Sequence, residues 1–131
     1  EEKYEWFLRG LQERFGRQVS VNLCFSADLA NVVYAGADLY LMPSKSEPCG
    51  LSQLMAMRFG AVPVVNATGG LKDTVPPYEG PESIDRALAL YYDAPEQWQE
   101  LVRHDMSQDF GWDKGAESYM ALYHKALGDK A

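Results

Sequence analysis

The sequence predicts an α/β fold in which a short parallel sheet is flanked by helices. Three short apolar runs, at residues 19–25, 39–43 and 61–66, have the composition of strands. Segments with apolar residues at helical spacing separate them. Buried parallel strands are nearly continuous apolar runs, and a helix is the usual connection between them. We therefore expect a truncated Rossmann-like sheet followed by helical C-terminal segments.

The helices are expected from apolar periodicity and from the residues that begin and end helices. Ser26 is suited to cap one helix, and Gly16, Gly36 and Gly60 are suited to end three of them. The expected helices span residues 4–15, 27–35, 50–60, 82–92, 95–104 and 113–126. Residues 76–82 are expected to form a loop. The apolar residues expected to face inward are Leu29, Val32, Val33, Leu51, Leu54, Met55 and Met57.

The length and composition favour one domain with its own core. The chain has 131 residues, of which 47% are hydrophobic. We expect one partial domain over residues 1–131, with the sheet and its ligand loops in 1–75 and the closing helices in 82–131. The formal net charge of −7 argues against nucleic acid as a ligand, because phosphate binding needs a basic face.

The two cysteines, Cys24 and Cys49, form neither a CxxC pair nor a disulfide scaffold. Cys24 lies in an apolar run and is expected to be a buried structural thiol. No apolar run approaches the length of a membrane span, and the N-terminus lacks a signal-peptide pattern. A reducing cytoplasm fits these features. Because the sequence does not begin with Met, we expect a fragment of a longer protein.

Three loops are expected at the carboxyl edge of the sheet, where α/β sheets bind their ligands. They span residues 25–28, 44–50 and 66–74. In the second loop, Gly50 opens a helix, so backbone N–H groups there can meet an anion. The carboxylate of Glu47 just before it is suited to accept hydrogen bonds from sugar hydroxyls. Together they indicate a sugar phosphate; the alternative is a solvated carboxylate and an ordinary turn.

The other two loops carry weaker signals. Gly69 and Gly70 can line a second anion site, with Lys72 as a counter-charge, or simply form a tight turn. Phe25 can stack on a base or pack in the core. The two histidines, His104 and His124, lie in the C-terminal helices and are interpreted as surface or structural residues. The helical aromatic residues are interpreted as packing residues: Tyr91, Tyr92, Trp98, Trp112 and Tyr119.

Residues 34–75 contain the motifs "AGAD", "MPS", "EPCGL.QL.AMR.G..PVV" and "TGGL.DTV". By these motifs the segment resembles the C-terminal domain of bacterial glycogen synthases and plant starch synthases, and the tail at 86–123 is also similar. These families are retaining GT-B glycosyltransferases that transfer glucose from ADP-glucose to the non-reducing end of an α-1,4-glucan. The resemblance implies the same fold and donor, with no further cofactor.

The resemblance also implies roles for the matching positions. Glu47 corresponds to the carboxylate that holds the donor glucose. Cys49, Gly50 and Leu51 correspond to the loop and helix start that meet the sugar and diphosphate, with Ser52 at a variable polar position beside them. Phe25 corresponds to an aromatic residue that stacks on adenine. The loop on the far side of the donor corresponds to Thr68, Gly69 and Gly70.

The chain departs from the family pattern in several places. A second Glu common in related transferases is replaced by Met55, and a His-Arg pair by Asn31 and Val32. The Arg and Lys that clamp the diphosphate, and the N-terminal domain with the acceptor surface, have no counterpart in this sequence. The segment after Tyr78 is shorter than usual. These departures predict weak donor binding and no catalysis by the chain alone.

Two further functions remain open on the sequence. One is a truncated or engineered Rossmann-like fragment that folds without a complete site and self-associates through exposed sheet edges. The other is a GT-B enzyme that uses a UDP-sugar. The expected partners of the full enzyme are the nucleotide-sugar donor and the glucan, without nucleic acid or membrane.

Overall fold

The computed structural model describes residues 2–75 and 84–128, which form seven helices and two strands. They fall into two compact units, Glu1–Val33 and Tyr34–Ala131. The single domain expected over residues 1–131 stays a prediction, and the loop expected at 76–82 lies outside the described residues.

The first unit contains a long helix and the beginning of a second. Helix α1 (Glu2–Phe15) ends just before Gly16, as expected. Helix α2 (Ala27–Gly36) begins after Ser26, whose side-chain oxygen accepts a hydrogen bond from the amide of Leu29 at 3.2 Å. The cap therefore satisfies one of the amides that a helix start leaves unpaired.

The strand expected at residues 19–25 is wrong. No segment in the described part of the chain pairs with it, and local bonds occupy two of its amides: Val19 donates to the carbonyl of Phe15 and Val21 to the side chain of Gln12. A β-strand is stable only when its backbone hydrogen-bonds to a neighbouring strand, so these residues remain irregular. Cys24 is exposed as a result, which corrects its expected burial.

The second unit is built on two parallel strands, β1 (Leu39–Met42) and β2 (Val62–Val65). Leu39 pairs with Val62 and Met42 with Val65, so both strands end at the same edge. Pro63 is tolerated inside β2 because neither strand of this two-stranded sheet has a second neighbour among the described residues. The parallel sheet is confirmed, with two strands instead of three.

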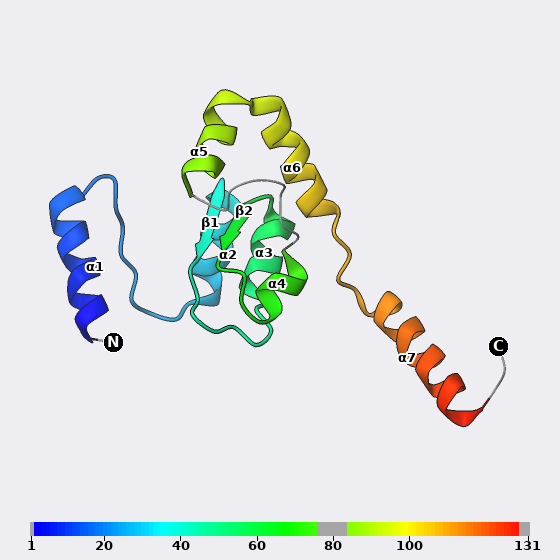
Figure 1. Cartoon of the computed structure of the whole chain (residues 1–131). Helices are drawn as coiled ribbons and strands as arrows, with labels where there is room; N and C mark the ends of the chain where they lie inside the picture. The colour runs from blue at the N-terminus through cyan, green and yellow to red at the C-terminus, as the bar shows by residue number, and fades with distance from the viewer. Residues whose placement is uncertain (1, 76–83, 129–131) are drawn as a thin grey trace. The chain divides into compact units, whose positions relative to one another are not determined.

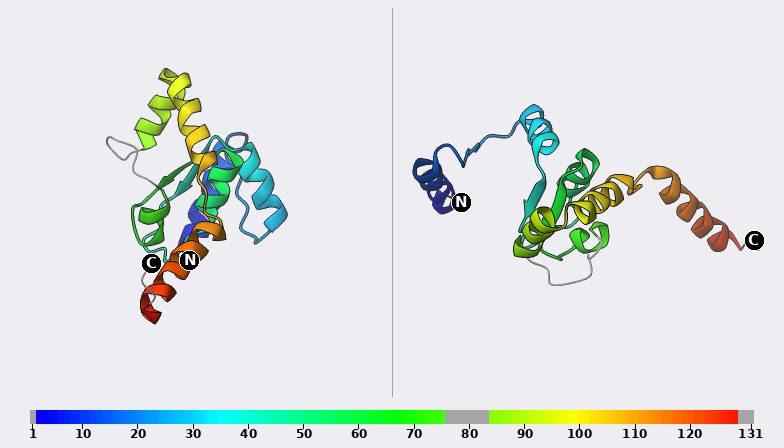
Figure 2. Two further views of the ribbon diagram at one scale, coloured as in Figure 1. Left: turned by 90° about the vertical axis from the view of Figure 1, so that its right-hand side faces the viewer. Right: turned by 90° about the horizontal axis from the view of Figure 1, so that it is seen from above.

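Helix α3 (Ser52–Phe59) connects the strands and packs against both, beside α4 (Gly70–Thr74) in Figure 1. Gly60 ends α3 in a left-handed conformation with φ of 88°. Helix α6 (Pro95–Ser107) packs on α3, on β2 and on α5 (Ile84–Asp93). The last helix is α7 (Trp112–Leu127), which is visible in both views of Figure 2. The three expected C-terminal helices are thus confirmed.

The core of this unit lies between α3, β2, α4 and α6. Its buried apolar residues are Ala56, Met57, Ala61, Val62, Leu71 and Trp98. The buried residues of α3 are Gln53, Ala56 and Met57, so the face that packs inward is rotated relative to the expected one. The inward orientation expected for Val32, Val33, Leu51 and Met55 is wrong, since all four are exposed.

Candidate functional site

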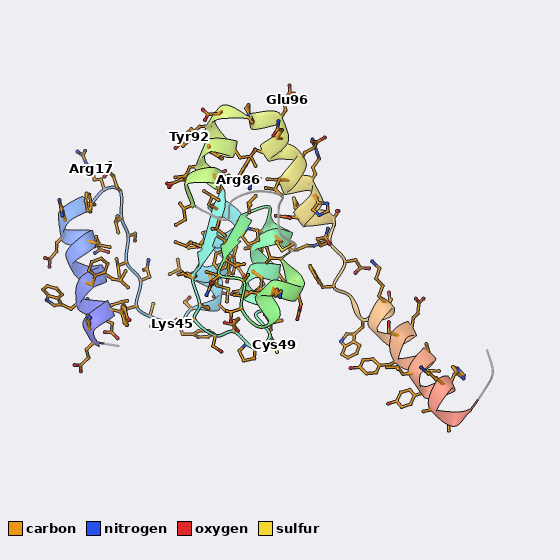
Figure 3. All side chains as sticks on the ribbon, in the orientation of Figure 1. Arg17, Lys45, Cys49, Arg86, Tyr92 and Glu96 are labelled. Atoms are coloured by element: carbon orange, nitrogen blue, oxygen red, sulfur yellow. The ribbon has the colours of Figure 1, made fainter. Side chains whose placement is uncertain are left out.

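The candidate site lies where the two strands end and their loops leave the sheet. The amide of Asn66, just after β2, donates to the carbonyl of Met42 at the end of β1 at 3.4 Å. Its side-chain Nδ2 donates to the carbonyl of Ser44 at 3.0 Å. Asn66 thus joins the starts of both loops. Lys45 and Cys49, labelled in Figure 3, belong to the loop beyond β1.

The two glycine-containing loops cross in direct backbone contact. The amide of Gly70 donates to the carbonyl of Glu47 at 2.9 Å. A Cβ added at Gly69, where φ is 51°, would collide with that same carbonyl oxygen, and a Cβ at Gly70 would collide with the backbone of Cys49. Only glycine fits at both crossing points. The structure therefore brings together two of the three loops that the sequence singles out.

Glu47 is half-buried at this crossing, and its carboxylate is held locally. Its Oε1 accepts a hydrogen bond from the amide of Gly50 at 3.1 Å. Gly50 is buried and adopts a left-handed conformation with φ of 64°. The second carboxylate oxygen accepts no bond from any residue that the structure describes. This oxygen is the acceptor available to a sugar hydroxyl.

The start of α3 offers fewer amides than the sequence suggests. The amide of Gly50 is engaged by Glu47, so it is not open to an anion as expected. Leu51 is the N-cap, no side chain caps the helix, and the amides of Leu51 and Ser52 have no acceptor among the described residues. These two backbone N–H groups, at the positive end of the helix dipole, therefore remain available to a ligand.

The hydroxyl of Ser52 faces the protein interior. It donates to the sulfur of Met42 at 3.2 Å. Burial, followed by the neighbouring Tyr40, raises the pKa of Tyr34. Ser52 can thus offer its backbone amide to a ligand, while its side chain is committed to packing between α3 and β1.

The second glycine loop is less suited to an anion than expected. The amides of Thr68 and Gly70 donate to the carbonyls of Asn66 and Glu47. Helix α4 has five residues and is too short to supply a strong dipole. Lys72 is exposed on it. This loop acts as a wall against the Glu47 loop, and a second anion site has little geometric support.

Phe25 belongs to the first unit and is 99% exposed. It does not pack in a core, so its ring is open to contact, and stacking on adenine stays a prediction. His104 and His124 lie on α6 and α7, as surface residues. Of the helical aromatics, Trp98 is buried against Tyr91, whereas Tyr92, Trp112 and Tyr119 are exposed, contrary to the packing expected of them.

Sequence reasoning missed Gln53 and Thr74. Gln53 is fully buried and donates from Nε2 to the carbonyl of Gly50 and to the hydroxyl of Thr74. A signal existed: Gln53 precedes the buried Ala56 and Met57 by three and four residues, which places it on the same helix face. A polar residue at the head of a buried face indicates a specific hydrogen-bonding task.

A cleft of about 590 Å³ lies beside the candidate site, between α3 and the end of α6. Leu51 and Arg58 line it from α3, and Asp105 and Met106 from α6. Asp105 is 7% exposed, and burial raises its pKa to about 6, against a smaller lowering by His104. Within residues 2–75 and 84–128 no cluster of His, Cys, Asp and Glu could hold a metal ion, and no helix is long and apolar enough to cross a membrane.

The comparisons with known proteins agree with this arrangement. Residues 8–104 match the family described as Glycosyl transferases group 1. The chain is 41% identical to a glycogen synthase of Thermotoga petrophila, across 97% of this chain and 30% of that protein. It is 43% identical to a glycogen synthase of Caldicellulosiruptor bescii, across 95% and 30%.

Among solved structures, the chain is similar to the catalytic domain of starch synthase IV from Arabidopsis thaliana bound to ADP and acarbose. The TM-score is 0.77 and the identity 31%, with 92% of this chain and 29% of that chain covered. The fold and the loops at its carboxyl edge define a glycosyltransferase domain of the GT-B kind. This chain belongs to the group 1 glycosyl transferases, and it spans about 30% of the length of the glycogen synthases it matches.

The Thermotoga petrophila alignment extends over 146 positions, more than the 131 residues of this chain. That relative therefore contains residues with no counterpart here. The short segment predicted after Tyr78 lies outside the described residues and stays a prediction.

Proposed function

We propose that this chain is the donor-side portion of an ADP-glucose-dependent glycogen or starch synthase. The complete enzyme transfers glucose, with retention at the anomeric carbon, to the non-reducing end of an α-1,4-glucan. The observation that carries the proposal is the crossing of the Glu47 loop and the Gly69–Gly70 loop at one sheet edge, next to the open start of α3. The similarity to glycogen synthases and to a starch synthase bound to ADP supports the choice of reaction and donor.

Each part of the site has a task in this reaction. The carboxylate of Glu47 accepts hydrogen bonds from the donor glucose, and the amides of Leu51 and Ser52 face the diphosphate. Cys49 and Gly50 shape the loop between them, and Thr68, Gly69 and Gly70 form its far wall. Phe25 stacks on adenine. Transfer releases ADP as an anion. Hydrogen-bond donors that are already in place before the reaction stabilise this developing charge, and each lowers the activation barrier by about 3 kcal/mol.

The isolated chain is not expected to catalyse transfer. Its formal charge of −7 opposes a diphosphate, so further cationic groups of the complete enzyme are required. The glucan acceptor also binds outside this portion. ADP-glucose is a substrate, and we propose no additional cofactor. Both cysteines are free, which fits the reducing cytoplasm that we propose for the complete enzyme.

One observation favours a second function. Each of the two strands has one edge that no described residue pairs, and such edges invite association with another chain. The alternative is therefore a non-catalytic or engineered fragment that self-associates without a complete site. Mass measurement in solution separates the two, because the donor-site proposal needs no dimer.

The proposal is tested by adding ADP-glucose to the chain while backbone amide NMR signals are followed, with UDP-glucose as the control. Selective shifts at Phe25, Leu51, Ser52 and Gly69 with ADP-glucose alone are expected. Equal shifts with UDP-glucose would favour a UDP-sugar enzyme. A well-dispersed spectrum without shifts at millimolar donor would contradict a surviving donor half-site.

A further inference from the structure

The buried amide of Gln53 has no task in the proposed donor contacts, yet it is fully buried at the edge of the site. Its Nε2 lies 2.7 Å from the carbonyl oxygen of Gly50 and 2.9 Å from the hydroxyl of Thr74. A carbonyl oxygen only accepts hydrogen bonds, so the NH₂ group of Gln53 must face Gly50. The orientation of the amide is thereby fixed.

These bonds form part of a closed circuit that begins and ends at Glu47. The carbonyl of Glu47 accepts from the amide of Gly70 at 2.9 Å, and the carbonyl of Gly70 accepts from the hydroxyl of Thr74 at 2.7 Å. Thr74 accepts from Gln53, and Gln53 donates to Gly50. The amide of Gly50 then donates to the carboxylate of Glu47 at 3.1 Å. Five residues thus close a ring that includes both the backbone and the side chain of Glu47.

We propose that Thr74 and Gln53 are positioning residues that set the place of the Glu47 carboxylate and the spacing of the two glycine loops. The inference rests on the proposed function for its consequence, which is donor affinity. Thr74 lies 21 residues from Gln53 and on another helix, so their hydrogen bond joins α4 to the start of α3. Neither residue contacts the donor.

The ring also explains why Gly50 lacks a side chain. A Cβ at Gly50 would lie 2.5 Å from Oε1 and 2.7 Å from Nε2 of Gln53. The amide of Gln53 therefore occupies the space beneath the Gly50 turn and supports it. Oε1 of Gln53 has no hydrogen-bond partner in the described part of the chain, so the amide is kept at a cost in desolvation. A residue used only for packing would not carry that cost.

The experiment compares Thr74→Val and Thr74→Ser in the chain as it is. Valine matches threonine in shape but can neither donate to Gly70 nor accept from Gln53, whereas serine keeps both bonds. The matched control is Ser118→Ala, which removes the same kind of hydroxyl bond, from Ser118 to the carbonyl of Lys114 one turn earlier in α7.

Two quantities are measured in each variant. The first is the change in the amide proton shift of Gly50 between about pH 3 and pH 7, which follows the ionisation of a carboxyl group hydrogen-bonded to it. The second is the affinity for ADP-glucose. In Thr74→Val, the amide shift of Gly50 is expected to lose this pH dependence, which is called the Gly50 titration below. The variant is also expected to bind ADP-glucose about fivefold more weakly, which is the effect of one ordinary hydrogen bond. Thr74→Ser and Ser118→Ala are expected to keep both.

An unchanged Gly50 titration and unchanged affinity in Thr74→Val would overturn the inference. If Thr74→Val does not fold, Gln53→Met, which keeps the length of the side chain without its donor, must show the same two losses. If the wild-type chain binds no ADP-glucose but Thr74→Val still loses the Gly50 titration, the positioning of Glu47 is supported and the donor proposal fails. The two failures are therefore distinguishable.

Discussion

The amide of Gly70 donates a hydrogen bond of 2.9 Å to the carbonyl oxygen of Glu47. This bond joins two segments that are more than 20 residues apart in the sequence and that leave neighbouring strands. It also places the backbones of both loops in van der Waals contact, where no side chain fits. Substitutions at the crossing therefore change both the stability of the unit and the shape of the candidate site.

Gly70→Ala is expected to destabilise the chain. The new Cβ would come within 2.9 Å of both backbone carbons of Cys49, and backbone atoms cannot move aside as a flexible side chain can. Overpacking of this kind costs about 1–3 kcal/mol of unfolding free energy, measured by urea denaturation. Gly10→Ala in α1 is the control: nothing lies within 4 Å of its Cβ, so it should stabilise its helix. Equal stability of wild type and Gly70→Ala would contradict the crossing.

Glu47→Gln is expected to separate binding from stability. The amide oxygen of glutamine can still accept from Gly50, so the unfolding free energy should fall by no more than about 1 kcal/mol. The negative charge that strengthens hydrogen bonds from glucose hydroxyls is lost, and ADP-glucose binding should weaken about tenfold or more. Titration calorimetry and urea denaturation measure the two effects. If the folded Glu47→Gln variant binds ADP-glucose as tightly as the wild type does, Glu47 does not contact the donor glucose.

The sequence predicted the parts of the fold whose causes are local. Gly60 and Ser26 marked the ends of helices correctly because a left-handed turn and a helix cap depend on a few neighbouring residues. The segment at residues 19–25 has the composition of a strand but lacks a paired neighbour among the described residues, and composition cannot report pairing.

The candidate site was predictable to a similar degree. Glycines at the loop crossing were recognisable in the sequence, but their use as backbone contact points, with no space left for an anion, was not. The engagement of the Gly50 amide by Glu47 and the links through Gln53 and Thr74 depend on where α4 packs. That placement is a tertiary property, so no spacing rule revealed it.

Gly60→Ala tests the helix end that sets the path from α3 to β2. Gly60 has φ of 88°, and its amide donates to the carbonyls of Ala56 and Met57. A Cβ there would meet Met106 Sδ at 3.4 Å, a contact that a flexible thioether can relieve, so the cost comes from the backbone. We expect a loss of about 1 kcal/mol by thermal or urea denaturation. Gly60→Asn should lose less, because asparagine tolerates this conformation better. A larger loss with asparagine than with alanine would point to steric conflict instead.

Asp105→Asn is expected to stabilise the protein at neutral pH. Burial raises the pKa of Asp105 from 3.8 to about 6, so the folded state binds its proton more tightly than the unfolded state does. The stabilising contribution is therefore complete below about pH 3.8 and is lost as the pH rises towards 6. His104 on the same helix lowers the pKa slightly, and two further charged residues, Arg58 from α3 and Asp109 beyond the end of α6, line the same cleft. Because that cleft admits solvent, we expect the variant to gain about 1–2 kcal/mol of unfolding free energy at pH 7 and nothing near pH 4.

Asp109→Asn is the control and should have the opposite effect, since the amide of Gly111 and then the charge of Lys114 lower the pKa of Asp109. Urea denaturation at several pH values measures the difference from wild type, and a gain for Asp105→Asn that does not grow between pH 4 and pH 7 would show that the carboxyl is not buried as described.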